Sequence, residues 1–274
     1  MKFENQFKIR VLENPDYKQY IEQGLISLEV YSLDGTSSYL YNGSNSSYAY
    51  NADKKIHSAS MIKLLILAEF MGRVDKGDVT LSEIHVINET DKGTGGAGHI
   101  NAFPLGTEVP LDDIAKFMIM YSDNAAANVL IDRLGKDNIN NKAKELQLKN
   151  TELGRKLIVE TPPPDNWTSA EDCSIILHKI YDNTLASKQM CDRAQEYLLA
   201  QIDDAAMGGV FKSKGIPFGH KTGSLAGATP ARHDGGIVYA KRPFVICATM
   251  EMVDAQSNPI MQDIANIAVE TLCG

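Results

Sequence analysis

The chain has 274 residues, and its content of 43% hydrophobic and 23% charged residues is ordinary for a globular protein with a substantial core. The net charge of −8 argues against a nucleic-acid-binding surface, which requires clustered lysine and arginine. No run of 18 apolar residues is present, so we expect no membrane span. The first residues include no apolar stretch with a small-residue cleavage site, which predicts a cytoplasmic protein unless a leader was removed.

Hydrophobic periodicity and turn signals divide the chain into strand-rich ends and a helical middle. The beginning predicts a short helix and then two strands, over residues 15–23, 25–33 and 38–41. The helix predicted over 60–74 is apolar nearly all round, so we expect it to be buried in the middle of a domain. Five further helices are predicted over 111–121, 123–134, 138–147, 169–182 and 188–201. Three strands and a final helix are predicted over 217–222, 234–240, 243–252 and 257–272.

These elements predict an α/β fold of the α+β type. The two ends of the chain, residues 1–59 and 206–274, would form one five-stranded antiparallel sheet flanked by helices. The middle, residues 60–205, would form an all-helical domain. A junction between two such domains is a usual place for a cleft that binds a small molecule, and we expect the protein to act as a monomer.

The sequence predicts neither a metal nor a cofactor. Its four cysteines are widely spaced without a CxxC pair, and its histidines form no HxH or HExxH pattern. Residues 93–98 match GxGxxG formally, but Pro104 and Gly106 follow where a dinucleotide site requires a helix. We interpret this segment as a flexible loop at the rim of the cleft.

Three short motifs in a fixed order carry the chemistry. They are Ser60-Met61-Ile62-Lys63, Ser122-Asp123-Asn124 and Lys221-Thr222-Gly223. Any one of them arises often by chance, whereas all three in this order do so rarely. Together they supply a nucleophilic hydroxyl, two lysines to manage its proton and a second hydroxyl to relay it.

The first motif predicts a nucleophile with its own base. A serine hydroxyl attacks well only when a neighbouring group takes its proton. Lys63 follows Ser60 by three residues, so both side chains lie on one face of the predicted helix. Apolar surroundings would lower the pKa of Lys63 and make a neutral, basic amine accessible. Taken alone, such a pair is more often an N-cap serine beside a lysine that reaches out to solvent.

The second motif lies at the junction of two predicted helices. Ser122 would pass a proton to a leaving nitrogen, and Asn124 would hold a substrate amide. Ser122 or Asp123 would also serve as the N-cap of the following helix, and both interpretations can hold together.

The third motif ends a predicted strand, and Ser224 follows directly. Its glycine would let a substrate approach the backbone closely, while its lysine supplies positive charge. A backbone N–H near Ser224 and that of Ser60 would form an oxyanion hole. Arg232 begins the next strand and would either clamp a ligand carboxylate or form a surface ion pair with Asp234.

The motifs and their flanking sequences resemble the class A serine β-lactamases and their relatives among the penicillin-binding proteins. The resemblance runs from about residue 24 to the C-terminus and includes HSASMIKLLIL, MYSDNAAANVLID and GHKTGSLAGATPARHDGGIVY. It implies a β-lactamase/transpeptidase-like fold with the site between the two domains, in a family that is usually secreted or periplasmic. It also implies that a β-lactam acylates Ser60 while Lys63 and Ser122 transfer protons. The groups implied around the substrate carboxylate are Lys221, Ser224 and Arg232.

One element of the class A pattern is missing. Class A enzymes carry a loop glutamate, followed closely by an asparagine, that activates the water which removes the acyl group. The corresponding loop reads GRKLIVETPPPDNWTSAED, in which Glu160 is the best candidate carboxylate. Pro164 stands where the asparagine is expected, and the loop is shortened. The sequence therefore predicts acylation and leaves deacylation open.

Three functions fit this pattern, each with a small-molecule substrate. The leading hypothesis is a β-lactam hydrolase. The second is a peptidase or esterase of the same fold that acts on D-Ala-D-Ala-like or ester substrates. The third is a binding or sensor protein that is acylated by β-lactams and remains so. Turnover of a chromogenic cephalosporin separates the first from the others, and a mass shift that persists for hours favours the third.

Overall fold

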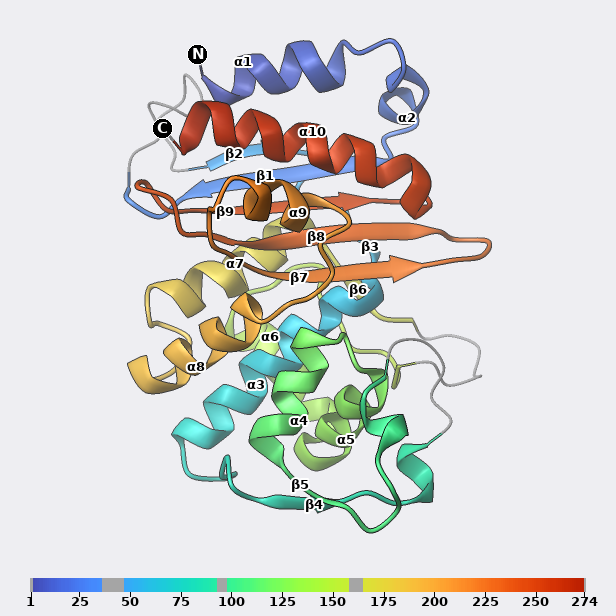
Figure 1. Ribbon diagram of the computed structural model, residues 1–274, viewed down its shortest axis with the longest axis vertical. Coiled ribbons are helices and arrows are strands. Elements are labelled where there is room, and N and C mark those ends of the chain that lie inside the picture. The colour runs from blue at the N-terminus through green and yellow to red at the C-terminus, as the bar shows by residue number, and fades with distance from the viewer. Residues whose placement is uncertain (1, 36–46, 93–97, 158–164, 274) are drawn as a thin grey trace.

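A computed structural model describes residues 2–35, 47–92, 98–157 and 165–273. Its centre is a five-stranded antiparallel sheet with the strand order β2-β1-β9-β8-β7 (Figure 1). The strands are β1 (Ile26–Ser32), β2 (Ser47–Tyr50), β7 (Phe218–Leu225), β8 (Ala231–Val238) and β9 (Phe244–Met250). The prediction that both ends of the chain share one antiparallel sheet is therefore confirmed.

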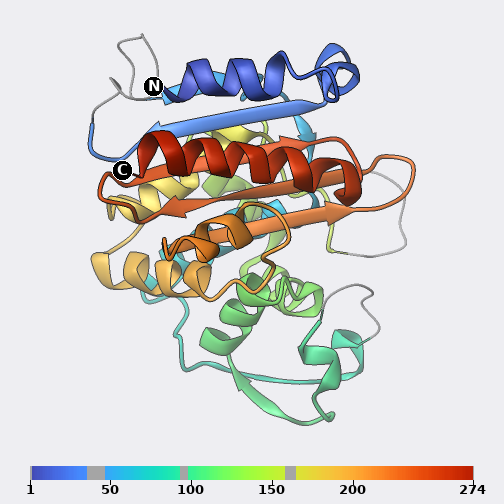
Figure 2. The ribbon, with the colours of Figure 1, turned by 45° about the horizontal axis from the view of Figure 1, so that its top comes forward.

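Helices from the two ends of the chain cover one face of this sheet, as Figures 1 and 2 show. They are α1 (Phe3–Phe7), the π-helix Lys8–Leu12, α9 (Met207–Ser213) and α10 (Asp254–Leu272). Side chains alternate along β1, so Leu28 and Val30 enter this core while Glu29 points to the opposite face. The short helix α2 (Lys18–Glu22) precedes β1.

The opposite face of the sheet packs against the helical part of the chain. That part contains α3 (Lys63–Asp75), α4 (Leu111–Met120), α5 (Asn124–Leu134), α6 (Lys136–Glu145), α7 (Ala170–Tyr181) and α8 (Lys188–Leu199). A single core runs from these helices to the sheet residues Ile237, Val245 and Cys247. Because this core is continuous, the division into residues 1–59 with 206–274 and 60–205 stays a prediction.

The long predicted elements match the structure within a few residues, and the short ones account for the differences. The predicted helix 60–74 is a 3-10 turn, Ala59–Ile62, followed by α3, and it is buried as expected. The strand predicted over 38–41 lies outside the described residues. The sequence analysis missed α1, α9, β2 and the small pairs β3 (Ile56–His57) with β6 (Trp167–Thr168) and β4 (Ile84–Val86) with β5 (Glu108–Pro110). Elements this short carry too little periodic signal to be recognised.

Within the described ranges, no helix combines the length and the apolar character that crossing a membrane requires. All four cysteines are free thiols.

Candidate active site

The three motifs meet where the turn before α3 lies against strand β7. Gly223 makes this approach possible, because a Cβ there would lie 3.1 Å from Ala59 Cβ and 3.2 Å from the Ser60 backbone nitrogen. Both distances are shorter than ordinary van der Waals contacts, so a side chain would push the strand away from the nucleophile. The third motif thus brings the backbone of β7 beside Ser60, where the sequence predicts an oxyanion hole.

Two residues of the site have left-handed backbone conformations. Ala59 has φ of 45° and Ser122 has φ of 53°, which cost non-glycine residues energy and occur often at functional sites. Ser122 leaves the end of α4 in this conformation, and both its carbonyl oxygen and its hydroxyl then face Lys63. The strained turn therefore presents two oxygen atoms of one residue to the same amine.

Lys63 is fully buried and reaches four oxygen atoms. Its Nζ lies 2.6 Å from Ser122 O and 2.7 Å from Asn124 Oδ1, and these carbonyl oxygens can only accept. It also lies 3.0 Å from Ser60 Oγ and 3.1 Å from Ser122 Oγ. A neutral amine has two N–H donors and one lone pair, so the two carbonyls use the donors and the lone pair remains for a hydroxyl proton. The arrangement therefore suits a neutral lysine that accepts a proton from Ser60.

Electrostatics favour the same protonation state. Burial lowers the pKa of Lys63 well below its usual value, and the neighbouring charge of Lys221 lowers it further. Asp123 opposes this shift but does not cancel it. The direction of this shift agrees with the poorly solvated, basic lysine that the sequence predicts next to Ser60.

Lys221 also contacts the Ser122 hydroxyl. Its Nζ lies 2.9 Å from Ser122 Oγ and 2.6 Å from Thr222 O. Burial lowers the pKa of Lys221 to about 7, although the carboxylates of Asp203 and Asp234 raise it. The Ser122 hydroxyl therefore lies between two buried lysine nitrogens, and the pKa of each is lowered by burial.

Asp123 shows that the second motif is structural as well. Its Oδ1 accepts a hydrogen bond from Ala126 N at 3.0 Å and caps α5, as one of the two interpretations predicted. Its Oδ2 accepts from the backbone N–H groups of His99 and Ile100, the latter at 2.8 Å. One buried carboxylate thus fixes the Ser122 turn to the segment that follows residue 98.

Arg232 is held in place by hydrogen bonds to Asp203 and Asn258. Both terminal nitrogens donate to the Asp203 carboxylate, at 2.9 and 3.1 Å, and Nε donates to Asn258 at 2.9 Å. The sequence analysis offered a surface ion pair between Arg232 and Asp234 as one alternative. In the structure Arg232 is 3% exposed and pairs with Asp203, while Asp234 binds His220 at 2.8 Å. Burial raises the pKa of Asp203, but the hydrogen bond and charge of Arg232 outweigh it, and the pKa falls to about 2. The role of Arg232 as a carboxylate clamp stays a prediction.

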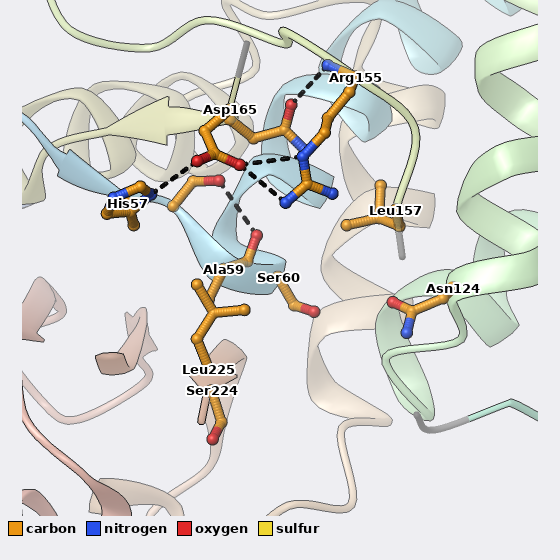
Figure 3. A pocket seen from close by; sticks show the side chains of 11 residues that line it. His57, Ala59, Ser60, Asn124, Arg155, Leu157, Asp165, Ser224 and Leu225 are labelled. Atoms are coloured by element: carbon orange, nitrogen blue, oxygen red, sulfur yellow. Dashed lines mark hydrogen bonds and ion pairs between the residues drawn. The ribbon is translucent and has the colours of Figure 1, made fainter. Parts of the chain in front are cut away.

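A pocket of about 320 Å³ opens beside Ser60 (Figure 3). Leu157 and Leu225 give it apolar walls, and Asn124 lines it next to the nucleophile. Asp165 also lines it, but Arg155 Nε and Nη2 bind that carboxylate at 2.9 and 2.7 Å. The pocket can receive an acyl group.

The loop opposite Ser60 is anchored at Leu157. Asn128 donates to Leu157 O at 3.0 Å, and its Oδ1 accepts from Leu157 N at 2.8 Å. These two bonds fix the backbone and direct the isobutyl side chain into the pocket. Glu160 and Pro164 lie outside the described residues, so the candidate carboxylate of the sequence analysis remains untested.

Sequence reasoning missed several residues that support the site. His233 is buried; its Nε2 donates to His57 O at 2.8 Å, and its Nδ1 accepts from Met250 N at 3.2 Å. Burial lowers the pKa of His233 to about 4, so the ring is neutral and joins β8 and β9 to the segment before Ser60. Asp203 and Leu157 were missed as well. None of them belongs to a motif, and nothing in the sequence pairs them with distant partners.

Comparison with known proteins agrees with this geometry. A model of the β-lactamase enzyme family matches residues 24–272. The chain belongs to this family. The family assignment and the β-lactamase fold expected from the motifs are thereby confirmed. A search of curated proteins by sequence gave no match.

Several solved structures of the family are similar to this chain. The β-lactamase of Sphaerobacter thermophilus DSM 20745 is 25% identical over 89% of this chain and 90% of its own, with a TM-score of 0.79. PBP-A is 24% identical over 98% of this chain and 94% of its own, with a TM-score of 0.78. The TLA-3 extended-spectrum β-lactamase is 18% identical over 94% of this chain and 98% of its own, with a TM-score of 0.81. The last two likenesses show a shared fold, so the reaction must be argued from the site.

Proposed function

We propose that the protein is a serine hydrolase that opens β-lactam rings through an acyl-enzyme on Ser60, and that it releases the acyl group slowly. The observation that carries the proposal is the position of Lys63 Nζ, 3.0 Å from Ser60 Oγ and 3.1 Å from Ser122 Oγ. One buried amine within reach of both hydroxyls links the nucleophile to a proton donor for the leaving group.

Acylation then follows from the contacts of the site. Ser60 Oγ gives its proton to neutral Lys63 and attacks the carbonyl carbon of the lactam. Backbone N–H groups of Ser60 and of the end of β7 stabilise the oxyanion that forms. When the C–N bond breaks, Ser122 Oγ–H gives a proton to the nitrogen, and the proton held on Lys63 replaces it through the 3.1 Å contact. Lys221 Nζ lies 2.9 Å from Ser122 Oγ. When Lys221 is protonated, its charge stabilises the negative charge that develops on Ser122 Oγ.

Deacylation requires a water molecule and a base beside the ester. On the pocket side of Ser60 the structure presents Leu157, and the nearby Asp165 carboxylate is already bound by Arg155. Asp165 is the only carboxylate among the described residues that line this pocket, and its pairing with Arg155 supports slow release of the acyl group. A mutant of PBP-A, which has a similar structure, was solved as an acyl-enzyme complex with penicillin G, and this supports the proposed acylation step. A D-Ala-D-Ala-type peptidase, or a β-lactam-binding sensor, is therefore the second candidate.

Covalent labelling with a fluorescent penicillin tests the proposal. We expect the native protein to be labelled at Ser60 and Ser60→Ala to remain unlabelled, with an unchanged melting temperature. Intact mass spectrometry after removal of excess penicillin then measures how long the adduct persists, which distinguishes efficient hydrolysis from slow release. Equal labelling of Ser60→Ala would remove Ser60 as the nucleophile and refute the proposal.

A further inference from the structure

The segment that leads to the nucleophile is held from two sides. On one side, the short strand β3, which ends at His57, pairs with β6. On the other side, His57 O accepts a hydrogen bond of 2.8 Å from the ring of His233, which lies on β8. The chain then continues through Ala59 to Ser60, as Figure 3 shows. The bond from His233 therefore fixes a carbonyl three residues before the nucleophile.

The ring of His233 makes this bond in one tautomer only. Met250 N is a donor that lies 3.2 Å from Nδ1, so Nδ1 must accept. Nε2 then carries the proton of the neutral ring and donates it to His57 O. Burial supports the neutral form, because it lowers the pKa of His233 to about 4. A buried, neutral ring thus links β9 to the segment that precedes Ser60.

The same ring lies against the third motif. Gly223 of β7 is paired with His233 of β8. A Cβ at Gly223 would lie 3.3 Å from His233 Cδ2 and 3.2 Å from Ser60 N. The ring, the glycine and the backbone nitrogen of the nucleophile therefore meet at one point. A shift of His57 away from this point would move Ser60 N relative to β7.

The backbone between His57 and Ser60 is strained. Ala59 has φ of 45°, a conformation that costs energy for residues with a Cβ. Such a conformation persists only where the surrounding contacts hold it. Without the bond from His233, Ala59 would relax to a negative φ and carry Ser60 N away from β7.

We propose that His233 is a positioning residue for acylation: its bond to His57 O holds Ala59 in the left-handed conformation and so directs the Ser60 N–H toward the oxyanion. This inference rests on the proposed acylation of Ser60 and gives a role in that reaction to a residue outside the three motifs. One donor to an oxyanion contributes about 10²–10³-fold to the rate of reaction. Displacement by about 1 Å costs up to about 10²-fold. The effect is therefore expected on the chemical step rather than on binding.

Two substitutions separate the bond to His57 from the packing of the ring. Glutamine is long enough to place its amide nitrogen near the position of Nε2 and to donate to His57 O. Asparagine is one methylene shorter and replaces only Nδ1, the acceptor for Met250 N. Rapid-quench labelling at several concentrations of a fluorescent penicillin gives the limiting acylation rate and the half-saturating concentration separately. We expect His233→Asn to lower the limiting rate by roughly tenfold or more, with a nearly unchanged half-saturating concentration. His233→Gln should stay within a few-fold of the native rate.

Ile237→Ala is the matched control, because it also removes a buried side chain from the same face of β8. It should lower the melting temperature and leave the limiting acylation rate unchanged. An unchanged rate in His233→Asn overturns the proposal. Equal losses in His233→Asn and His233→Gln overturn it too, since that result indicates that the packing of the ring, rather than its hydrogen bond, supports the site.

The strain at Ala59 provides a second test. Glycine adopts a positive φ without the cost that alanine bears, so Ala59→Gly should restore several-fold of the rate lost in His233→Asn. Gln147→Gly is the control, because Gln147 has φ of 59° just after α6, in a different part of the fold. It should relieve similar strain without restoring the rate. If both glycine variants restore the rate equally, or neither does, strain at Ala59 is not what His233 opposes, and the proposal fails.

Two further outcomes separate this inference from the function on which it rests. If penicillin does not acylate the native protein, the proposed function itself fails and the inference falls with it. If His233→Asn does not fold, nitrogen NMR of the histidine rings in the native protein decides. A His233 ring with a slowly exchanging proton on Nε2 supports the bond to His57 O. A proton on Nδ1 contradicts it, because such a ring cannot donate to that carbonyl.

Discussion

The two sides of Ser60 are built for different steps. On one side, a serine hydroxyl and two buried lysines form a continuous path of hydrogen bonds. On the other side, the pocket presents the apolar side chain of Leu157, and the Asp165 carboxylate is bound by Arg155. The first side can take a proton from the nucleophile and return it to a leaving group. The second side can hold an acyl group, and the only carboxylate among its described residues is already paired with an arginine.

Formation and hydrolysis of the ester therefore require different arrangements of side chains. Forming it needs a dry amine with an available lone pair, which burial of Lys63 supplies. Hydrolysing it needs a carboxylate or amine with lone pairs directed at water. Asp165 meets this requirement poorly, because its Oδ1 accepts two bonds from the Arg155 guanidinium and its Oδ2 lies 3.7 Å from His57 Nδ1.

The largest effect is expected on the proton-transfer side. Lys63→Ala should slow acylation by a fluorescent penicillin by at least about 10²-fold, since it removes a positioned general base. Lys142→Met is the matched control, because Lys142 is also a buried lysine of the helical part but bonds Glu145. The control should be labelled at the native rate. A near-normal rate in Lys63→Ala would assign the base to another group.

The next effect concerns the pocket side. Leu157→Glu places a carboxylate in the pocket beside Ser60, and we expect it to speed release of the penicilloyl group by roughly tenfold or more. Leu157→Gln has nearly the same shape without the basic group and should retain the slow release. Stopped-flow measurement with a chromogenic cephalosporin separates the burst from the steady rate. Equal release rates in the two variants would show that side-chain shape, rather than a base, limits deacylation.

The same measurement tests Glu160, the carboxylate chosen from the sequence. We expect Glu160→Gln to lower the residual steady rate and to leave the burst intact, because acylation depends on Lys63. If the steady rate is unchanged, the water is activated elsewhere, and Lys63 is the first candidate.

The parts of the site that could be predicted are those that lie in local motifs. Ser60 and Lys63 are three residues apart, so helical spacing alone brings them together. The burial of α3, and with it the lowered pKa of Lys63, follows from an apolar sequence that leaves no polar face. The order of strands at the two ends likewise predicted one shared sheet.

The missed parts depend on contacts between distant segments. Asp203 binds Arg232 from 29 residues away, and no pattern in the sequence selects it over the other acidic residues. Leu157 reaches the pocket because Asn128 holds its backbone, which is 29 residues away as well. Such pairs follow from the tertiary fold rather than from local propensity or periodicity.

Substitution of Arg232 should have a smaller effect than the substitutions of Lys63 and Leu157. Arg232→Ala should raise KM for penicillins by roughly tenfold and lower kcat less, as expected for a group that binds substrate and transition state equally. It should also lower the free energy of unfolding by about 1–3 kcal/mol, because Asp203 loses its partner. Thermal melts and steady-state kinetics measure the two effects.

The double variant Arg232→Ala/Asp203→Ala identifies the cause of the KM effect. If KM returns toward the native value, the single substitution acted through the uncompensated charge of Asp203. If KM stays high, Arg232 contacts the substrate itself. A fall in kcat alone would contradict both explanations and assign Arg232 to the transition state.

The smallest effect is a pH dependence that separates the roles of the two lysines. Lys221 has a pKa of about 7, so it is charged below that pH and neutral above it. Acylation by benzylpenicillin should therefore fall several-fold between about pH 6.5 and 8, as the attraction for its carboxylate is lost. Acylation by the methylamide of benzylpenicillin, which has no charged carboxylate, should not fall, because Lys63 only becomes more available as a base when pH rises. Lys221→Arg, which stays charged, should remove the decline for benzylpenicillin, and a decline of equal size for both substrates would show that Lys221 acts on proton transfer instead.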